Sequence, residues 1–152
     1  MNTTTTDRIE KKTLLRAPRA RVWHAIADAA EFGAWFQVKI EGEFAPGAHL
    51  NGAMTLPGHE HNHWEIVVDR IEPETLFSFY WHPGGEEPGY DYAVEPSTLV
   101  EFRLEDADGG TMLTLVESGF DGLPLERRAR AFAGNSEGWD FQLKALVAYV
   151  TR

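Results

Sequence analysis

Three histidines at alternate positions are the first residues of this sequence whose spacing is suited to chemistry. They are His59, His61 and His63, within the stretch GHEHNHWEIVVD. In an extended strand, residues i and i+2 share a face and lie about 6.6 Å apart. Two imidazoles so placed can reach one zinc or copper ion at about 2.1 Å, and Glu65 is placed to complete the set. A metal site is therefore one interpretation of this stretch.

The pattern on the other face of the same strand favours a different interpretation. The apolar residues that alternate with the histidines and should face a core are Trp64, Ile66 and Val68. The histidines then lie on the wet face of a strand, where imidazole changes its charge near neutral pH. We expect this exposed face rather than a metal site. The third interpretation is a place at the mouth of a cavity, where His61 or His63 could titrate near neutral pH. The next apolar residue after Val68, Ile71, falls at an odd position and breaks this alternation, which predicts a β-bulge near residues 69–70.

A single carboxylate is the second candidate for chemistry. In TMLTLVESG, Glu117 follows Leu113 and Leu115 at alternate positions, which places it on the apolar face of a strand. A buried carboxylate needs polar partners. It could orient a polar group of a ligand or act as a general acid or base, for example with His82. The alternatives are a structural hydrogen bond, for example from the indole of Trp139, and exposure at the strand end.

Aromatic residues at alternate positions predict the wall of a cavity. In LFSFYWH, the residues Phe77, Phe79 and Trp81 share the face that should point inward. For any one of these rings the alternative is that it simply fills the core. We predict the following ligand-binding side chains: Trp35, Phe36, Trp64, Phe77, Phe79, Trp81, Phe102, Leu115, Glu117, Trp139 and Leu143.

Length and composition limit the class of protein. The chain has 152 residues and is 43% hydrophobic, which suits one globular domain over residues 8–152 after a disordered tail at 1–7. No apolar run approaches the ~18 residues that span a membrane, and the start lacks a secretory signal pattern. The absence of cysteine excludes disulfides and thiolate nucleophiles. Cytoplasm is the default expectation.

The charge argues against polyanionic partners. The net charge is −10, from 24 acids against 14 bases, so the surface repels phosphate backbones and anionic lipids. The stretch ERRARA contains Arg127, Arg128 and Arg130, which cannot share one narrow helix face and have no interleaved aromatic residues. We interpret it as a solvated helix surface and expect neither a nucleic acid nor a membrane as partner.

These candidate residues must be positioned by a sheet and a few helices. Residues 8–16 predict a first strand. Pro18 suits the first turn of a helix, and Asp28 can cap a second short helix that ends near residue 36. The pattern then changes to a period of two and predicts an antiparallel meander of strands at 38–44, 48–56, 61–71, 75–82, 97–105 and 111–119.

The C-terminal segment, residues 123–152, has the longest helical pattern, with Pro124 near its start. Its apolar stripe recurs at spacings of three and four: Phe132, Ser136, Trp139, Leu143, Leu146 and Val150. Gly134 and Gly138 interrupt the pattern, and each costs about 1 kcal/mol relative to alanine. We interpret the two glycines as a bend or a close approach to the sheet.

Four stretches in this order resemble one known superfamily. They are APRARVWHAIAD…WF, PGAHLNG, IEPETLFSFYW and GGTMLTLVESGF…GW…L…L, which together cover roughly residues 8–150. They resemble the START-like, helix-grip (SRPBCC) proteins and, within them, stand-alone bacterial homologues of the heat-shock-chaperone ATPase activator. The resemblance implies an α+β helix-grip fold: a curved seven-stranded antiparallel sheet around a long C-terminal helix, with two short helices after the first strand.

The resemblance also implies an apolar cavity between the sheet and the long helix. We therefore expect the chain to bind a small, largely apolar molecule, aromatic or lipid-like, without a cofactor and as a monomer or weak dimer. Residues 83–96, rich in Gly, Pro and acid, would form part of a lid. The alternatives are a cyclase or dehydratase that uses Glu117 and a chaperone-related interaction module. No known catalytic motif is present, so an enzyme is the weaker expectation.

Overall fold

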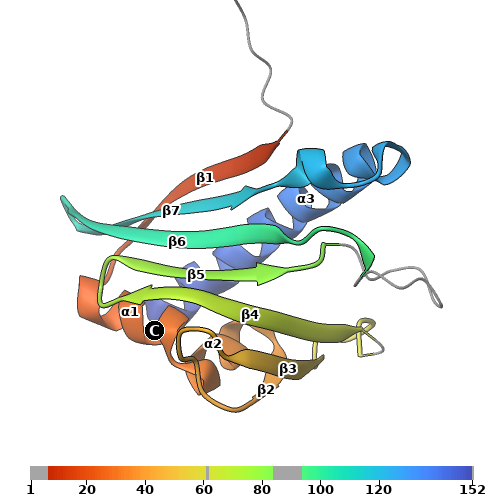
Figure 1. The fold of residues 1–152 in the computed structure, drawn as a ribbon. Coiled ribbons are helices and arrows are strands. Elements are labelled where there is room, and N and C mark those ends of the chain that lie inside the picture. Colours follow the sequence, from red (N-terminus) through yellow and green to blue (C-terminus); the bar gives the residue numbers. More distant parts are fainter. Residues whose placement is uncertain (1–6, 61, 84–93, 152) are drawn as a thin grey trace, which may run out of the picture.

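The computed structural model describes residues 7–60, 62–83 and 94–151, which form an α+β fold (Figure 1). The strands are β1 Arg8–Leu15, β2 Val38–Glu41, β3 His49–Met54, β4 His63–Glu72, β5 Leu76–Trp81, β6 Thr98–Ala107 and β7 Gly110–Ser118. The helices are α1 Arg19–Ala27, α2 Ala29–Phe36, the 3-10 turn η2 Phe120–Gly122 and α3 Leu125–Val150. The order of elements predicted from the sequence is confirmed.

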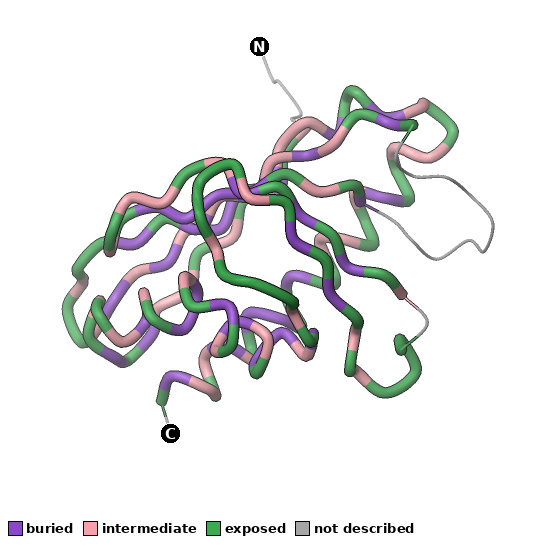
Figure 2. The backbone as a smooth tube through the Cα atoms, turned by 60° about the horizontal axis from the view of Figure 1, so that its bottom comes forward, coloured by how far each residue is buried: buried purple, intermediate pink, exposed green. Residues whose placement is uncertain are grey.

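The strands form one antiparallel sheet in the order β1-β7-β6-β5-β4-β3-β2. Neighbours along the chain pair with one another from β2 to β7, and β1 closes the far edge beside β7. The helices all lie against one face of this sheet, with α3 running across it (Figure 1). Buried and exposed residues are interleaved along the strands (Figure 2), as expected of a sheet with one covered face.

The two short helices form where the sequence places their ends. α1 starts after Pro18, whose missing N–H costs nothing at that position. Asp28 lies between the helices, and its side chain accepts a hydrogen bond from the backbone N–H of Glu31 at 3.0 Å. The predicted cap is therefore confirmed.

The β-bulge predicted from the interrupted alternation at Ile71 is also confirmed. The register between β4 and β5 shifts between Val68 and Arg70. Ser78 on β5 holds the bulge, because its hydroxyl donates to Asp69 Oδ2 at 3.0 Å and accepts from the backbone N–H of Arg70 at 3.1 Å. Ser78 is fully buried although the alternation places it on the outer face, and these two hydrogen bonds satisfy its hydroxyl.

The helix α3 continues through both of its glycines. A Cβ atom added at Gly134 or Gly138 would meet no atom within 4 Å. The predicted close approach of these glycines to the sheet is therefore wrong, because the space beside them is open.

The core lies between the sheet and the helices. Its centre is an aromatic cluster in which Phe32 of α2 packs against Phe79 and Phe102 of the sheet, with ring centroids 6.4 and 6.2 Å apart. These three rings are fully buried. No helix of the described residues is long and apolar enough to cross a membrane.

The start of the described chain is tied to the end of β7. The predicted tail lies outside the described residues except for Asp7. The Asp7 carboxylate accepts hydrogen bonds from the backbone N–H groups of Gly119 and Asp121 at 3.3 and 3.0 Å.

Candidate ligand-binding site

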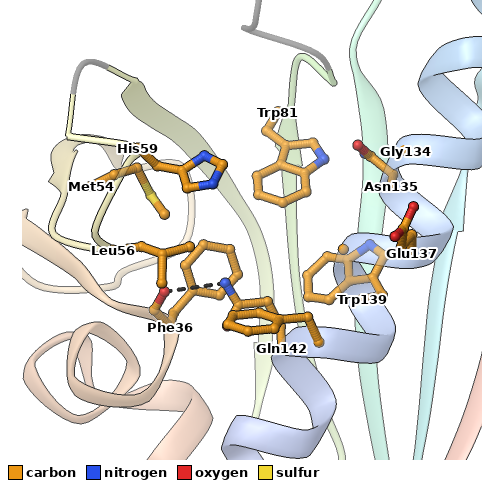
Figure 3. A pocket seen from close by; sticks show the side chains of 12 residues that line it. Phe36, Met54, Leu56, His59, Trp81, Gly134, Asn135, Glu137, Trp139 and Gln142 are labelled. Carbon is orange, nitrogen blue, oxygen red and sulfur yellow. Dashed lines mark hydrogen bonds between the residues drawn. The ribbon is translucent and has the colours of Figure 1, made fainter.

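A pocket of about 500 Å³ opens between α3 and the connection from β3 to β4 (Figure 3). This volume falls within the range of about 300–1,000 Å³ that is usual for small-molecule sites. The lining residues come from α2, from β3 and the loop after it, from the end of β5, and from α3. They are Phe36, Met54, Leu56, His59, Trp81, Gly134, Asn135, Glu137, Gly138, Trp139, Phe141 and Gln142.

Three aromatic rings from different elements meet at this pocket. Trp81 and Trp139 are stacked, with ring centroids 5.6 Å apart and an interplanar angle of 28°. The ring of Phe36 lies 6.3 Å from Trp81 and 6.1 Å from Trp139. The structure therefore brings together three of the side chains that the sequence predicts as ligand-binding.

Glu117 lies behind the two indoles and is fully buried. Its Oε1 accepts hydrogen bonds from Trp139 Nε1 at 2.8 Å and from Asn135 Nδ2 at 3.0 Å. Its Oε2 accepts from Trp81 Nε1 at 2.8 Å, from Thr98 Oγ1 at 2.6 Å and from Asn135 Nδ2 at 3.0 Å. The hydrogen bond expected from the indole of Trp139 is confirmed.

This arrangement suits an ionised carboxylate, because that group only accepts hydrogen bonds and all four partners donate. Both oxygens are occupied, and Glu117 is not among the residues that line the pocket. His82, the proposed partner in proton transfer, is exposed and is not one of the donors to Glu117. Glu117 therefore orients the two indoles. This geometry does not support a role for its carboxylate as a general acid or base towards a ligand in the pocket.

Gly134 and Gly138 form one wall of the pocket. Residues i and i+4 of a helix lie on the same face, and here that face has no side chains at these two positions. The next residue along the wall, Phe141, is 53% exposed. The spacing of the glycines was visible in the sequence, but only the structure shows that they leave room rather than permit contact.

Other predicted side chains lie deeper or elsewhere. The side chains that are fully buried in the core and do not line this pocket are Phe77, Phe79, Phe102 and Leu115. Trp35 is also buried, and its indole donates to the backbone oxygen of Ala25 at 2.8 Å. Trp64 lines an adjoining pocket of about 170 Å³ with Phe36 and Trp81, whereas Leu143 lines a groove between α3 and β1. Ligand contact by these residues stays a prediction.

Sequence reasoning missed the lining residues contributed by loops and by polar helix positions. Met54, Leu56 and His59 come from the β3–β4 connection. Gln142, on α3, is nine-tenths buried and its Nε2 donates to the backbone oxygen of Phe36 at 3.2 Å. Its Oε1 is buried without a hydrogen-bond partner in the described part of the chain.

His59 and His63 take the exposed position that the alternation indicates, and His59 also lines the pocket. His63 is exposed and its Nε2 lies 3.0 Å from Asn51 Oδ1, while Glu65 is hydrogen-bonded to His49 of the neighbouring strand. His61 lies outside the described residues. Among the residues that the structure describes, no group of three potential ligands is arranged to hold a metal ion.

Arg127 departs from the predicted solvated surface. Its Nε and Nη2 contact both oxygens of Glu95 at 2.6–3.1 Å, and its Nη2 also donates to the backbone oxygen of Pro83 at 3.0 Å. Only 12% of the Arg127 side chain and 3% of the Glu95 side chain are exposed. The interpretation as solvated surface is therefore wrong for Arg127. Residues 84–93, which make up most of the predicted lid, lie outside the described residues.

The sheet, the long helix and the pocket beside it define a helix-grip protein. The family model described as "Activator of Hsp90 ATPase homolog 1-like protein" matches residues 16–151, so the chain belongs to that family. The resemblance seen in the sequence is thereby confirmed.

Solved structures show the same fold. Protein MLL2253 from Mesorhizobium loti is 22% identical with a TM-score of 0.75, over 95% of this chain and 97% of that one. Protein Ms6760 from Mycobacterium smegmatis is 20% identical with a TM-score of 0.75, over 94% and 90% of the two chains. DynU16, from the dynemicin biosynthetic locus, is 22% identical with a TM-score of 0.71, and the match covers 95% of this chain but 47% of DynU16. No curated protein matches the chain.

Proposed function

We propose that this protein binds a small, largely apolar molecule in the pocket between α3 and the β3–β4 connection. The observation that carries the proposal is the open wall formed by Gly134 and Gly138 opposite a cluster of aromatic rings. Packing within the described residues requires neither glycine, yet each costs about 1 kcal/mol relative to alanine inside a helix. Their absent side chains leave room, and the room adjoins Trp81 and Trp139.

The aromatic rings supply the apolar contact that such a ligand needs. Small-molecule sites are concave and mostly apolar, with few polar groups that set the orientation of the ligand. Here Phe36, Trp81, Trp139 and Phe141 supply apolar surface, while Asn135 is held in place by its hydrogen bonds to Glu117. The indoles are fixed by the same carboxylate, so the ligand would meet a surface that is already ordered.

The test is to fill the pocket and to follow binding at the indoles. Gly138→Leu places an isobutyl group in open space. Ala148→Leu is the matched control, because Ala148 is exposed on the same helix about 15 Å further along and does not line the pocket. The indole N–H signals of Trp81 and Trp139 would be followed by NMR during titration with small phenols, flavonoids and other apolar compounds.

We expect saturable shifts of these two signals in the unaltered protein and in Ala148→Leu, and their loss in Gly138→Leu. Equal binding to Gly138→Leu would place the ligand elsewhere. Catalysis by Glu117 has no support in this geometry, because its oxygens are occupied by structural hydrogen bonds. A chaperone-related interaction stays a prediction that rests on family membership.

A further inference from the structure

Among the described residues that line the pocket, the side chains that can carry a charge are Glu137 and the imidazole of His59. Glu137 is the single carboxylate among them, and none of these described residues is lysine or arginine. The whole chain carries a net charge of −10. At about pH 8, where imidazole is ordinarily neutral, an anionic ligand would enter a negative field and find no cationic side chain among the described lining residues.

A second negative charge lies directly behind the aromatic rings. Within the described part of the chain, Glu117 accepts five hydrogen bonds, each from an uncharged donor, so dipoles stabilise its charge but do not neutralise it. Two of the donors are the indole N–H groups of Trp81 and Trp139, whose rings line the pocket (Figure 3). Electrostatic interactions are weakly screened in such a buried setting. The negative potential of the Glu117 carboxylate therefore extends through the two indole rings into the pocket.

The rings themselves attract positive charge. The face of an aromatic ring is negative, and tryptophan binds a cation over its face best of all side chains. Donating its N–H to a carboxylate moves electron density into the indole, which strengthens this attraction. The two tryptophans are thus polarised in the sense that favours a cation in the pocket.

A buried amide adds to the same field. The Nε2 of Gln142 donates to the backbone oxygen of Phe36, which fixes which end of the amide is the oxygen. That oxygen, Oε1, is buried and has no hydrogen-bond partner among the described residues. Its negative partial charge is therefore uncompensated beside the pocket.

We infer that the ligand of this pocket is an organic cation, an ammonium group joined to an apolar body. This inference rests on the proposed function, because it specifies the ligand of the same pocket. The apolar body would lie against the aromatic rings, and the ammonium group would lie near Glu137 and the indoles. At about pH 8, fatty acids and other apolar anions are expected to bind more weakly than such a cation.

Three probes of nearly the same shape distinguish the contribution of ligand charge to the affinity from that of apolar contact. They are benzyltrimethylammonium, neutral benzyl methyl sulfone and anionic benzylsulfonate. Their Kd values would be measured by NMR at about pH 8, where imidazole is ordinarily neutral. We expect the cation to bind about tenfold more tightly than the sulfone, within the range of cation–π energies, and the sulfonate to bind most weakly.

Glu137→Gln tests the charge without touching the core, because Glu137 is exposed. It should weaken binding of the ammonium probe about threefold at low salt, as expected of an exposed charge, and leave the sulfone unchanged. Glu126→Gln is the matched control, since Glu126 is exposed on the same helix and does not line the pocket. It should change neither affinity.

The outcomes distinguish the inference from the proposed function. If the sulfone or the sulfonate binds as tightly as the ammonium probe, and Gly138→Leu abolishes that binding, the cation inference fails while the pocket remains a binding site. If no probe and no apolar compound binds, both fail. An affinity for the ammonium probe that is the same in Glu137→Gln and Glu126→Gln would also argue against a charge-selective pocket.

Discussion

At the scale of single residues, Glu117 organises the site. A buried carboxylate is stabilised only when its oxygens accept enough hydrogen bonds. Here donors from β5, from the start of β6 and from α3 converge on it: Trp81, Thr98, Asn135 and Trp139. One side chain therefore links the sheet to the helix and sets the orientation of two rings that line the pocket.

Glu117→Gln should destabilise the fold. The glutamine side chain replaces one acceptor oxygen by an N–H₂ group, which would face donors that then lack an acceptor. Each buried donor left unsatisfied costs about 1–3 kcal/mol, so we expect the free energy of unfolding to fall by about 3 kcal/mol in urea titrations. Glu105→Gln is the control, because Glu105 is exposed on β6, and it should change stability by less than about 0.5 kcal/mol. Equal stability of the two variants would show that the carboxylate charge is not needed.

Alternation in the sequence predicts the face on which a residue lies but not its depth along the strand. Phe79 and Trp81 share the inward face of β5, yet Phe79 is covered by Phe32 of α2, whereas Trp81 lies at the strand end and lines the pocket. The coverage depends on where the helices cross the sheet. The sequence therefore predicted the fully buried Phe77 and the pocket residue Trp81 as one set, and only tertiary packing separates them.

At the scale of elements, the two glycines of α3 lower the stability of the helix, and replacing them should raise the free energy of unfolding. Gly134→Ala and Gly138→Ala should each raise the free energy of unfolding by up to about 1 kcal/mol, because alanine favours the helix and its Cβ meets nothing. Gly33→Ala is the contrasting variant, since its Cβ would lie 2.3 Å from the backbone oxygen of Val38. It should lower stability by about 1–3 kcal/mol. Destabilisation by Gly134→Ala or Gly138→Ala would contradict the open wall.

The end of α3 is held to the first two helices by a polar contact. Tyr149 donates its hydroxyl to Glu31 Oε1 at 3.0 Å, and Arg21 donates to the same oxygen at 2.6 Å while lying 5.0 Å from the centroid of the Tyr149 ring. Burial raises the pKa of Tyr149, and the hydrogen bond to Glu31 raises it further. The phenol therefore keeps its proton to higher pH than in the unfolded chain.

This contact predicts a stability change at alkaline pH. Because the folded pKa of Tyr149 lies above the unfolded value of about 10, its contribution is fully present below about pH 10 and is lost as the pH rises through the folded pKa. The difference in tyrosinate absorbance between the unaltered protein and Tyr149→Phe gives the titration curve of this residue. We expect its midpoint above pH 10, and a midpoint at or below that value would contradict the contact.

The features of the helices and strands that could be predicted are those that depend on residues close to one another in the sequence. The Asp28 cap and the bulge near residues 69–70 are local, so their signals lie within a few positions. The buried ion pair of Arg127 is not local, because its partner Glu95 lies just before β6, 32 positions earlier in the chain. A helix face that is polar in sequence can be covered by such a segment, and composition alone does not show it.

At the scale of the whole molecule, the pocket draws on α2, the β3–β4 connection, β5 and α3, so a ligand would link elements from both layers of the fold. A ligand that binds only the folded state raises the free energy of unfolding by about 2.7 kcal/mol at 100 times its Kd. We therefore expect benzyltrimethylammonium to raise the Tm of the unaltered protein and of Ala148→Leu in proportion to the logarithm of its concentration. Gly138→Leu should show no such rise. A rise of the same size in Gly138→Leu would mean that the stabilisation arises at another site, since the pocket of that variant is filled.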